Sequence, residues 1–306
     1  MSYKIGIDGG GTKTEYALFA DSPRPLLTYS GPRSNHEVLP GGIPEAAETL
    51  HAGISRLLET ARLSLKDIRG ISMGIAGMDR PGQILEMKGR LSRYGIEDPY
   101  ICNDGFLIVK AGSPGGYGIG YNAGTGTCCN AIYPDGSMIQ LGGFGDFSGD
   151  TGNANWNAIR TFRAVYDDAV LHLKNTRMTE RYLKAFHIHT PEELIDSIGT
   201  LQSGLNPDAV PLLNTILFEG FREKDPAALC ILEEITERAS DFISCLAKEF
   251  PAGDAALPVI LAGSVHEKQA GPAYLSTLTQ KIQTKSNRKI SLHILDRRPV
   301  IGAFYL

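Results

Sequence analysis

Cysteines are few and scattered in this sequence of 306 residues. The five cysteines show neither C-x-x-C spacing nor neighbouring histidines, so they form no disulfide framework and no recognisable zinc motif. We expect reduced thiols and no structural zinc. Cys128 and Cys129 are adjacent in a β-rich segment and should point to opposite faces of a strand. We therefore expect one of them in the core and the other near a cleft.

Long apolar runs and an excess of basic charge are also missing. The longest apolar stretches, such as residues 258–263, are far shorter than the ~20 residues that span a bilayer. Residues 4–7 begin a strand where a signal peptide would need an apolar segment. The formal net charge is −4, and no stripe of Lys and Arg could follow a nucleic-acid backbone. We expect a cytoplasmic protein that binds neither membranes nor nucleic acid.

What the sequence does contain is one pattern that occurs twice: a strand, a turn of Gly and Thr, and a second strand. Residues 3–8 and 14–20 flank the first turn, and residues 117–122 and 128–133 flank the second. The length also fits two domains better than one. We therefore predict a duplicated unit of domain size, with a first domain at 1–112 and a larger second domain at 113–306 that carries helical insertions.

The other predicted elements alternate between strands and helices, which indicates an α/β fold. In the first half they are a strand at 26–30, a helix at 43–63, a strand at 71–76, a helix at 83–94 and a strand at 100–103. In the second half they are a hairpin at 135–136 leading into a strand at 138–139, helices at 153–173, 212–222 and 227–250, and a strand at 258–262 followed by a helix. The span 180–208 shows no clear periodicity.

The first turn has the composition of a phosphate-binding loop. Gly9, Gly10 and Gly11 would let backbone N–H groups approach a phosphate closely, and Thr12 could donate its hydroxyl. Asp8 is placed to hold Mg²⁺ through water, because Mg²⁺ keeps most of its hydration shell. The alternative is a tight hairpin turn without a ligand, since one glycine run is weak evidence for a site.

A second and a third glycine turn strengthen this interpretation. Gly124, Thr125, Gly126 and Thr127 offer a similar set of amides and hydroxyls, so two facing turns could hold a phosphate chain from both sides. Gly263 and Ser264 follow a buried strand and could lie against an adenine or a ribose. The alternative for the third turn is a helix N-cap at Ser264.

Asp104 is the candidate general base. It directly follows the strand at 100–103, which places its carboxylate at the C-terminal edge of a sheet, where open α/β sheets bind ligands. Phosphoryl transfer to a hydroxyl requires such a carboxylate to accept the hydroxyl proton. The alternative is an aspartate that caps a helix.

Several separated motifs, in this order along the chain, resemble the N-acetylglucosamine kinases of the BadF/BadG/BcrA/BcrD ATPase family. They are DGGGTKT at 8–14, SNH at 34–36, GIAG at 74–77, ND at 103–104, AGTGT at 123–127, GGFGDFSGDTGNANW at 142–156 and LAGSV at 261–265. The resemblance implies the actin-like ATPase fold, in which two ribonuclease-H-like domains enclose a central cleft for ATP and sugar. It also implies Mg²⁺, a small sugar as substrate and a possible homodimer.

The resemblance also implies a role for individual residues. Contacts to ATP fall on Gly9, Gly10, Gly11, Thr12, Lys13, Gly124, Thr125, Gly126, Gly263 and Ser264. Asp104 becomes the base for the 6-hydroxyl of the sugar, and the sugar pocket consists of Asn35, Asp104, Thr127, Gly143, Phe144, Gly145 and Asp150. From the residues alone, Asn35 and Asp150 would be turn residues whose side chains bond to the backbone.

The sequence departs from this family pattern at three places. Thr151 stands where the acetylglucosamine kinases usually have glutamate, and Phe144 where they often have tryptophan. Both positions bear on the choice of substrate. Family members commonly continue beyond the position of Leu306 with a helix that returns to the first domain, so the last residues here are expected to pack back on that domain in a different way.

The favoured function is an ATP-dependent kinase for the 6-hydroxyl of an amino sugar, most readily N-acetylglucosamine. Glucosamine or another hexose is the alternative within the same class. A second class is an activator ATPase that holds an iron-sulfur cluster between subunits, and the cysteines inside predicted strands and helices argue against it. A third is a sugar sensor that has lost catalysis, which the presence of Asp104 and both turns disfavours.

Overall fold

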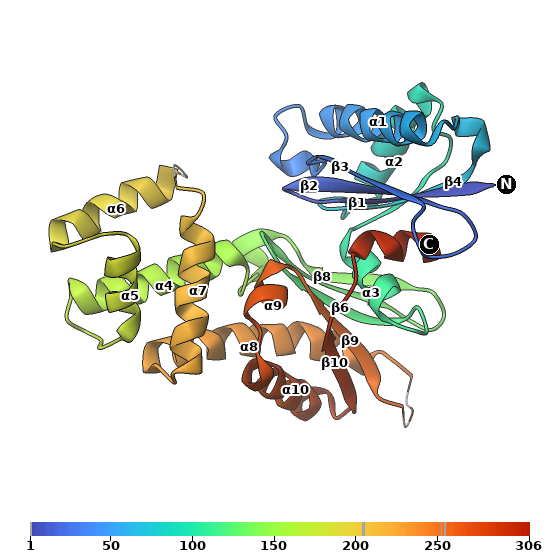
Figure 1. The fold of residues 1–306 in the computed structure, drawn as a ribbon. Coiled ribbons are helices and arrows are strands. Elements are labelled where there is room, and N and C mark those ends of the chain that lie inside the picture. Colours follow the sequence, from blue (N-terminus) through green and yellow to red (C-terminus); the bar gives the residue numbers. More distant parts are fainter. Residues whose placement is uncertain (1, 204–205, 252, 254) are drawn as a thin grey trace.

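The computed structural model describes residues 2–203, 206–251, 253 and 255–306. Within these residues the chain forms two five-stranded sheets, each packed against helices. Figure 1 shows the first sheet with helices α1 and α2 on one side, the second sheet below it, and a group of helices that extends away from the second sheet. None of the described helices is both long enough and apolar enough to cross a bilayer.

The first sheet has the strand order β3-β2-β1-β4-β5. Its strands are β1 (Tyr3–Gly9), β2 (Lys13–Phe19), β3 (Leu27–Pro32), β4 (Ile68–Ile75) and β5 (Tyr100–Cys102). The first three are antiparallel neighbours, whereas β4 and β5 run parallel to β1. Helices α1 (Gly42–Ala61) and α2 (Pro81–Leu91) bury their apolar stripes in the core of this sheet, because residues such as Leu50 and Ile54 recur at helical spacing.

The second sheet has the order β10-β9-β6-β7-β8, which is the same arrangement when its strands are counted from β6. Its strands are β6 (Gly118–Ala123), β7 (Thr127–Ile132), β8 (Met138–Gly142), β9 (Leu257–Ala262) and β10 (Ile290–Ile294). Again the first three are antiparallel and the last two parallel to the central strand. The predicted duplication of an α/β unit is therefore confirmed.

Helices fill the rest of the second half. They are α4 (Ala154–Ala169), α5 (Arg177–Ala185), α6 (Pro191–Ser203), α7 (Ala209–Arg222), α8 (Pro226–Lys248), α9 (Ser264–Gln269) and α10 (Pro272–Ser286). The helices predicted near 153–173, 212–222 and 227–250 correspond to α4, α7 and α8. The span 180–208, which showed no periodicity, contains most of α5 and all of α6, and its residues 204 and 205 lie outside the described residues.

Short 3-10 helices complete the secondary structure. They are η1 (His36–Val38), η2 (Leu65–Asp67), η3 (Ser92–Tyr94), η4 (Gly145–Ser148) and η5 (Pro299–Tyr305). The predicted helix at 83–94 is thus α2 with η3 as its last turn. The helical segment ends at Gly95, whose left-handed backbone is a common way to terminate a helix.

Two elements cross between the sheets. Helix α3 (Gly105–Gly112) follows β5 of the first sheet but packs on β6, β7 and β9 of the second. Helix η5 follows β10 of the second sheet but packs on β1, β2 and β4 of the first, and Figure 1 shows it in red between the first sheet and α3. The division of the chain into domains at residue 112 stays a prediction, and α3, on the first-domain side of it, packs against the second sheet.

Candidate active site

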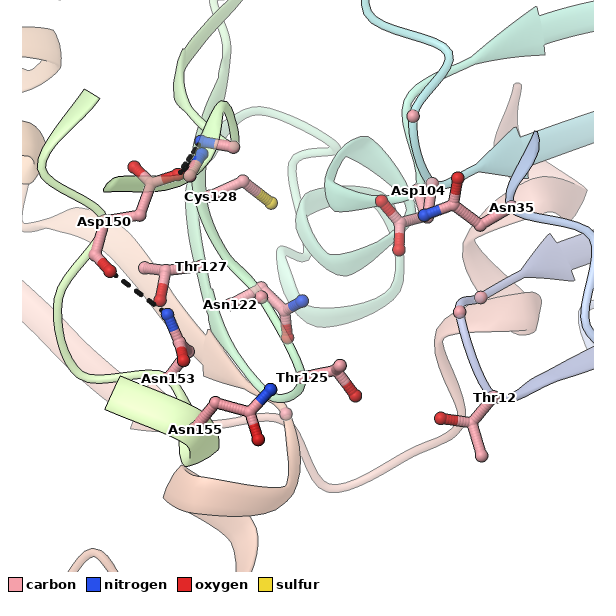
Figure 2. A pocket seen from close by; sticks show the side chains of 18 of the residues that line it. Thr12, Asn35, Asp104, Asn122, Thr125, Thr127, Cys128, Asp150, Asn153 and Asn155 are labelled. Carbon is pink, nitrogen blue, oxygen red and sulfur yellow. Dashed lines mark hydrogen bonds between the residues drawn. The ribbon is translucent and has the colours of Figure 1, made fainter. Parts of the chain in front are cut away.

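A cavity of about 930 Å³ is lined by residues from both halves of the chain. Figure 2 shows Asp104 and Asn35 on one side of it, and Thr127, Cys128 and Asp150 on the other. Among the described residues, most of the predicted site residues line this cavity; the exceptions are Gly9, Gly124, Phe144 and Ser264. A cavity lined by convergent polar groups is the usual form of a small-molecule site.

The first glycine turn presents its backbone to the cavity. The turn is closed by the Gly10 N–H, which donates to the Lys13 carbonyl at 2.9 Å. A Cβ added to Gly11 would meet no protein atom within 4 Å, so it would occupy open space that an anion can use. Gly9 has a different role: it is buried in β1, and a Cβ there would lie 2.4 Å from the Ser34 hydroxyl.

The second turn has the same construction between β6 and β7. The Gly124 N–H donates to the Gly126 carbonyl at 2.9 Å, and the Gly124 carbonyl accepts from the Ala154 N–H that begins α4. A Cβ on Gly126 would again meet nothing. Both turns therefore fit the phosphate chain of a nucleotide, because each leaves backbone accessible where a side chain would block it.

The third turn needs glycine for a different reason from the one expected. Gly263 has φ +93°, and a Cβ there would lie 2.4 Å from the Ala123 carbonyl. Glycine thus allows this turn to approach β6 closely. The alternative N-cap at Ser264 is wrong, because Gly263 is the N-cap and Ser264 is the exposed first residue of α9.

Asp104 occupies the N-cap position of α3, but its side chain forms no capping hydrogen bond. It lines the cavity instead. Burial raises the pKa of its carboxyl to about 7, the charge of Asp79 adds to the increase, and the backbone N–H groups of Gly105 and Asp104 oppose it. A carboxylate with a pKa near neutrality is suited to accept a proton.

Asp8 lies near the end of β1 and also lines the cavity. Burial raises its pKa to about 7, the charge of Asp104 adds to this, and Lys13 lowers it. No group of three or more His, Cys, Asp or Glu side chains that could hold a metal occurs among the described residues.

Asp150 organises the predicted sugar loop. Its Oδ2 accepts from the N–H groups of Gly143 at 2.9 Å and Gly145 at 2.8 Å. Both glycines have positive φ, which explains why the loop requires them. The Asp150 side chain is buried, and its Oδ1 has no partner among the described residues. Phe144, between the two glycines, is half exposed and does not line the cavity.

Neighbouring residues complete this wall. The Thr127 hydroxyl donates to the Thr151 carbonyl at 3.2 Å, and the Thr151 hydroxyl is buried without a partner among the described residues. Cys128 lines the cavity while Cys129 lies in the core of the second sheet, so the prediction for this pair is confirmed. Asn35, on the opposite wall, accepts from the Glu37 N–H at 2.9 Å, as a turn residue would, and lines the cavity as well.

Sequence reasoning missed a polar network centred on Asp79, which also lines the cavity. The Asp79 Oδ1 accepts from Asn103 at 2.8 Å and from Gln140 of β8 at 3.0 Å. Gln140 also donates to the Gly142 carbonyl, so the network joins the loop after β4 to the sugar loop. The signal was available, because Asp79 closely follows β4 as Asp104 follows β5.

One face of α4 was also missed. It lines the cavity beyond the second turn and consists of Asn155, Trp156, Ile159, Arg160 and Arg163. Figure 2 shows Asn155 near Thr125. Counted from Asn155, the other four residues follow after one, four, five and eight positions, which places these side chains on one side of a helix, and this regularity was visible in the sequence.

Comparisons with known proteins agree with this architecture. The chain is 25% identical over 237 residues to an N-acetylmuramic acid/N-acetylglucosamine kinase of Clostridium acetobutylicum, covering 76% of each protein. It is 25% identical over 206 residues to an N-acetyl-D-glucosamine kinase of Dictyostelium discoideum, covering 62% of each.

Solved structures share the fold over the whole chain. A Chromobacterium violaceum protein assigned as an N-acetylglucosamine kinase superposes with a TM-score of 0.70 at 22% identity, covering 100% of this chain and 98% of that one. A glucokinase of the ROK family from Streptomyces griseus, in complex with glucose and AMPPNP, gives 0.61 at 16% identity, covering 99% and 98%. The expected actin-like ATPase fold is confirmed. The model of the BadF/BadG/BcrA/BcrD ATPase family matches residues 5–306, and the chain belongs to that family.

Proposed function

We propose that this protein is an ATP-dependent kinase that phosphorylates the 6-hydroxyl of an amino sugar, with N-acetylglucosamine as the first substrate to test. The observation that carries the proposal is the convergence of three features on one cavity. Two glycine turns with open backbone, the carboxylate of Asp104 and the loop organised by Asp150 all line it. The kinase names of the two curated relatives support the same reaction.

In this proposal the turns at 10–13 and 124–126 bind the phosphates of ATP, and Gly263 lies near the adenosine. Asp8 would hold Mg²⁺ through water, and the bound ion would neutralise negative charge on the phosphates. Asn35, Thr127 and the loop from Gly143 to Asp150 would bind the sugar. Phe144 and Ser264 do not line the cavity, so their loops would have to move before either side chain could contact a ligand.

Asp104 would accept the proton of the 6-hydroxyl as the oxygen attacks the γ-phosphate. The carboxylate ends up protonated, ADP leaves, and the proton is released to solvent with the sugar 6-phosphate. Replacing Asp104 by Asn keeps the size of the side chain but removes the base. We expect Asp104→Asn to bind ATP and sugar nearly as the wild type does and to lose roughly 10²-fold or more in kcat.

The experiment that tests the function is a coupled assay of ADP release. It compares N-acetylglucosamine, glucosamine, N-acetylmannosamine and glucose, with the product identified by mass spectrometry. Sugar-dependent ADP release that falls in Asp104→Asn supports the kinase. ADP release that is independent of any sugar would favour an ATPase instead, and near-wild-type turnover of Asp104→Asn would remove this residue from the mechanism.

A further inference from the structure

Carboxylates line both ends of the cavity, but cationic side chains line only one of them among the described residues. Three cationic side chains line it, counted among the described residues: Lys13 on the first glycine turn, and Arg160 and Arg163 on α4 beyond the second turn. All three belong to the end with the phosphate-binding turns, where three carboxylates, those of Asp8, Glu15 and Glu267, line the cavity as well. The opposite end, where the sugar is proposed to bind, has no lining cation in the described part of the chain.

Five carboxylates line this sugar end. They are Glu37, Asp79, Asp104, Asp146 and Asp150. None of them forms an ion pair within the described residues. Their partners are neutral where any are present: Asp79 accepts from two side-chain amides and Asp150 from two backbone N–H groups. The negative charge at this end is therefore not compensated by the protein.

Two observations show that this charge acts on the interior of the site. The first is Asp150, which is 3% exposed and retains a buried Oδ1 with no partner among the described residues, so a ligand or solvent group must satisfy it. The second is the effect of one carboxylate on another, since burial raises the pKa of Asp104 and the nearby charge of Asp79 raises it further. Arg238 of α8 reaches the sugar loop, but it donates to the carbonyls of Ser148 and Gly149 and does not line the cavity.

We infer that the sugar site selects by charge: it accepts hexosamines without a carboxylate and rejects anionic ones, such as those with a lactyl ether. The inference rests on the proposed function. It separates this chain from its Clostridium acetobutylicum relative, whose name includes N-acetylmuramic acid. The physical reason is like-charge repulsion in a partly enclosed cavity, where water screens poorly and the phosphates of ATP add further negative charge.

The test compares three sugars at pH 8, above the pKa of Asp104. They are N-acetylglucosamine, N-acetylmuramic acid and the methyl ester of N-acetylmuramic acid, which keeps the bulk of the lactyl group but removes its charge. We expect kcat/KM for the acid to be at least about tenfold below that for N-acetylglucosamine, and the ester to recover most of the difference. High ionic strength should reduce the difference in kcat/KM between the acid and the ester, because salt screens the repulsion.

A charge-reversal variant tests whether the carboxylates at the sugar end cause the discrimination against the acid. Asp146 is exposed on η4, and Asp146→Lys should raise kcat/KM for the acid relative to N-acetylglucosamine by at least about threefold. Glu48→Lys, on the exposed face of α1, makes the same change in net charge away from the cavity and should leave the ratio unchanged. An acid used within threefold of N-acetylglucosamine would overturn the inference, and so would an ester rejected as strongly as the acid. No turnover with N-acetylglucosamine or any other neutral sugar would refute the proposed function itself, and this inference with it.

Discussion

The contact between α3 and η5 gives a sharp prediction about stability. Gly302 is buried in η5, and a Cβ added to it would lie 2.2 Å from the backbone carbonyl oxygen of Leu107 in α3. That distance is far below any normal contact, and the obstacle is backbone, which cannot turn away as a side chain could. Gly302→Ala therefore has to push α3 and η5 apart.

The expected cost of Gly302→Ala is roughly 1–3 kcal/mol in the free energy of unfolding, the range for an overpacked interior, and it belongs at the upper end because backbone must move. For a protein of this size each kcal/mol lowers the melting temperature by about 2–4 °C. Because Asp104 lies at the start of α3, the same shift should also lower kcat. Thermal denaturation measures the loss of stability, and the ADP-release assay measures the change in kcat.

Gly89 provides the matched control. It lies exposed in α2, and a Cβ there would meet no atom within 4 Å. Gly89→Ala makes the same chemical change and should stabilise the protein by about 0.5–1 kcal/mol through helix propensity. If Gly302→Ala melted at or above the temperature of the wild type, with unchanged kcat, the close crossing of α3 and η5 would be refuted.

Three further predictions concern the cavity. Because the pKa of Asp104 is raised to about 7 and only its ionised form can accept a proton, kcat/KM should fall as the pH drops below about 7; a profile that stays flat to pH 5.5 would contradict this. Asp150→Ala removes the acceptor for two backbone N–H groups, so it should cost about 2–4 kcal/mol in the free energy of unfolding and raise KM for the sugar. Asp150→Asn keeps an acceptor and should lose less stability. Calorimetry measures the stability and kinetics the KM, and equal melting temperatures for both variants would count against the assigned bonds. Asp8→Ala should shift the magnesium dependence of activity to higher concentration, and an unchanged magnesium titration would exclude Asp8 as the position of the ion.

Much of the site was predictable because its features are local in the chain. Glycine turns between β-rich runs mark places where backbone must be accessible, and an aspartate directly after a strand marks the functional edge of a sheet. These rules found the two turns, Asp8 and Asp104. Extended to an aspartate a few residues beyond a strand, the second rule would also have found Asp79, which stands four residues after the end of β4.

Other elements could not be read from local patterns. Strand β10 has five residues, which are too few positions to show a period, and it is an edge strand that pairs only with β9 in the described part of the chain. Helix α5 has only nine residues, and α6 buries only Leu194 among its described residues, so neither helix presents a long apolar stripe. The role expected for Phe144 came from resemblance, and that for Ser264 came from a glycine turn after a buried strand. Whether those side chains reach the cavity depends on loop geometry that no spacing rule contains.

By itself, the sequence determined the duplicated α/β unit, the turns and the main candidate base, because periodicity and turn chemistry act between residues that are close in the chain. Only the tertiary structure decided that α3 packs on the second sheet and η5 on the first, since such packing depends on the shapes of surfaces far apart in sequence. That crossing brings both turns and Asp104 to one cavity. It also gathers five carboxylates from four separate segments at the sugar end, where no cation lines the cavity among the described residues, and this distribution appears only when the chain is folded.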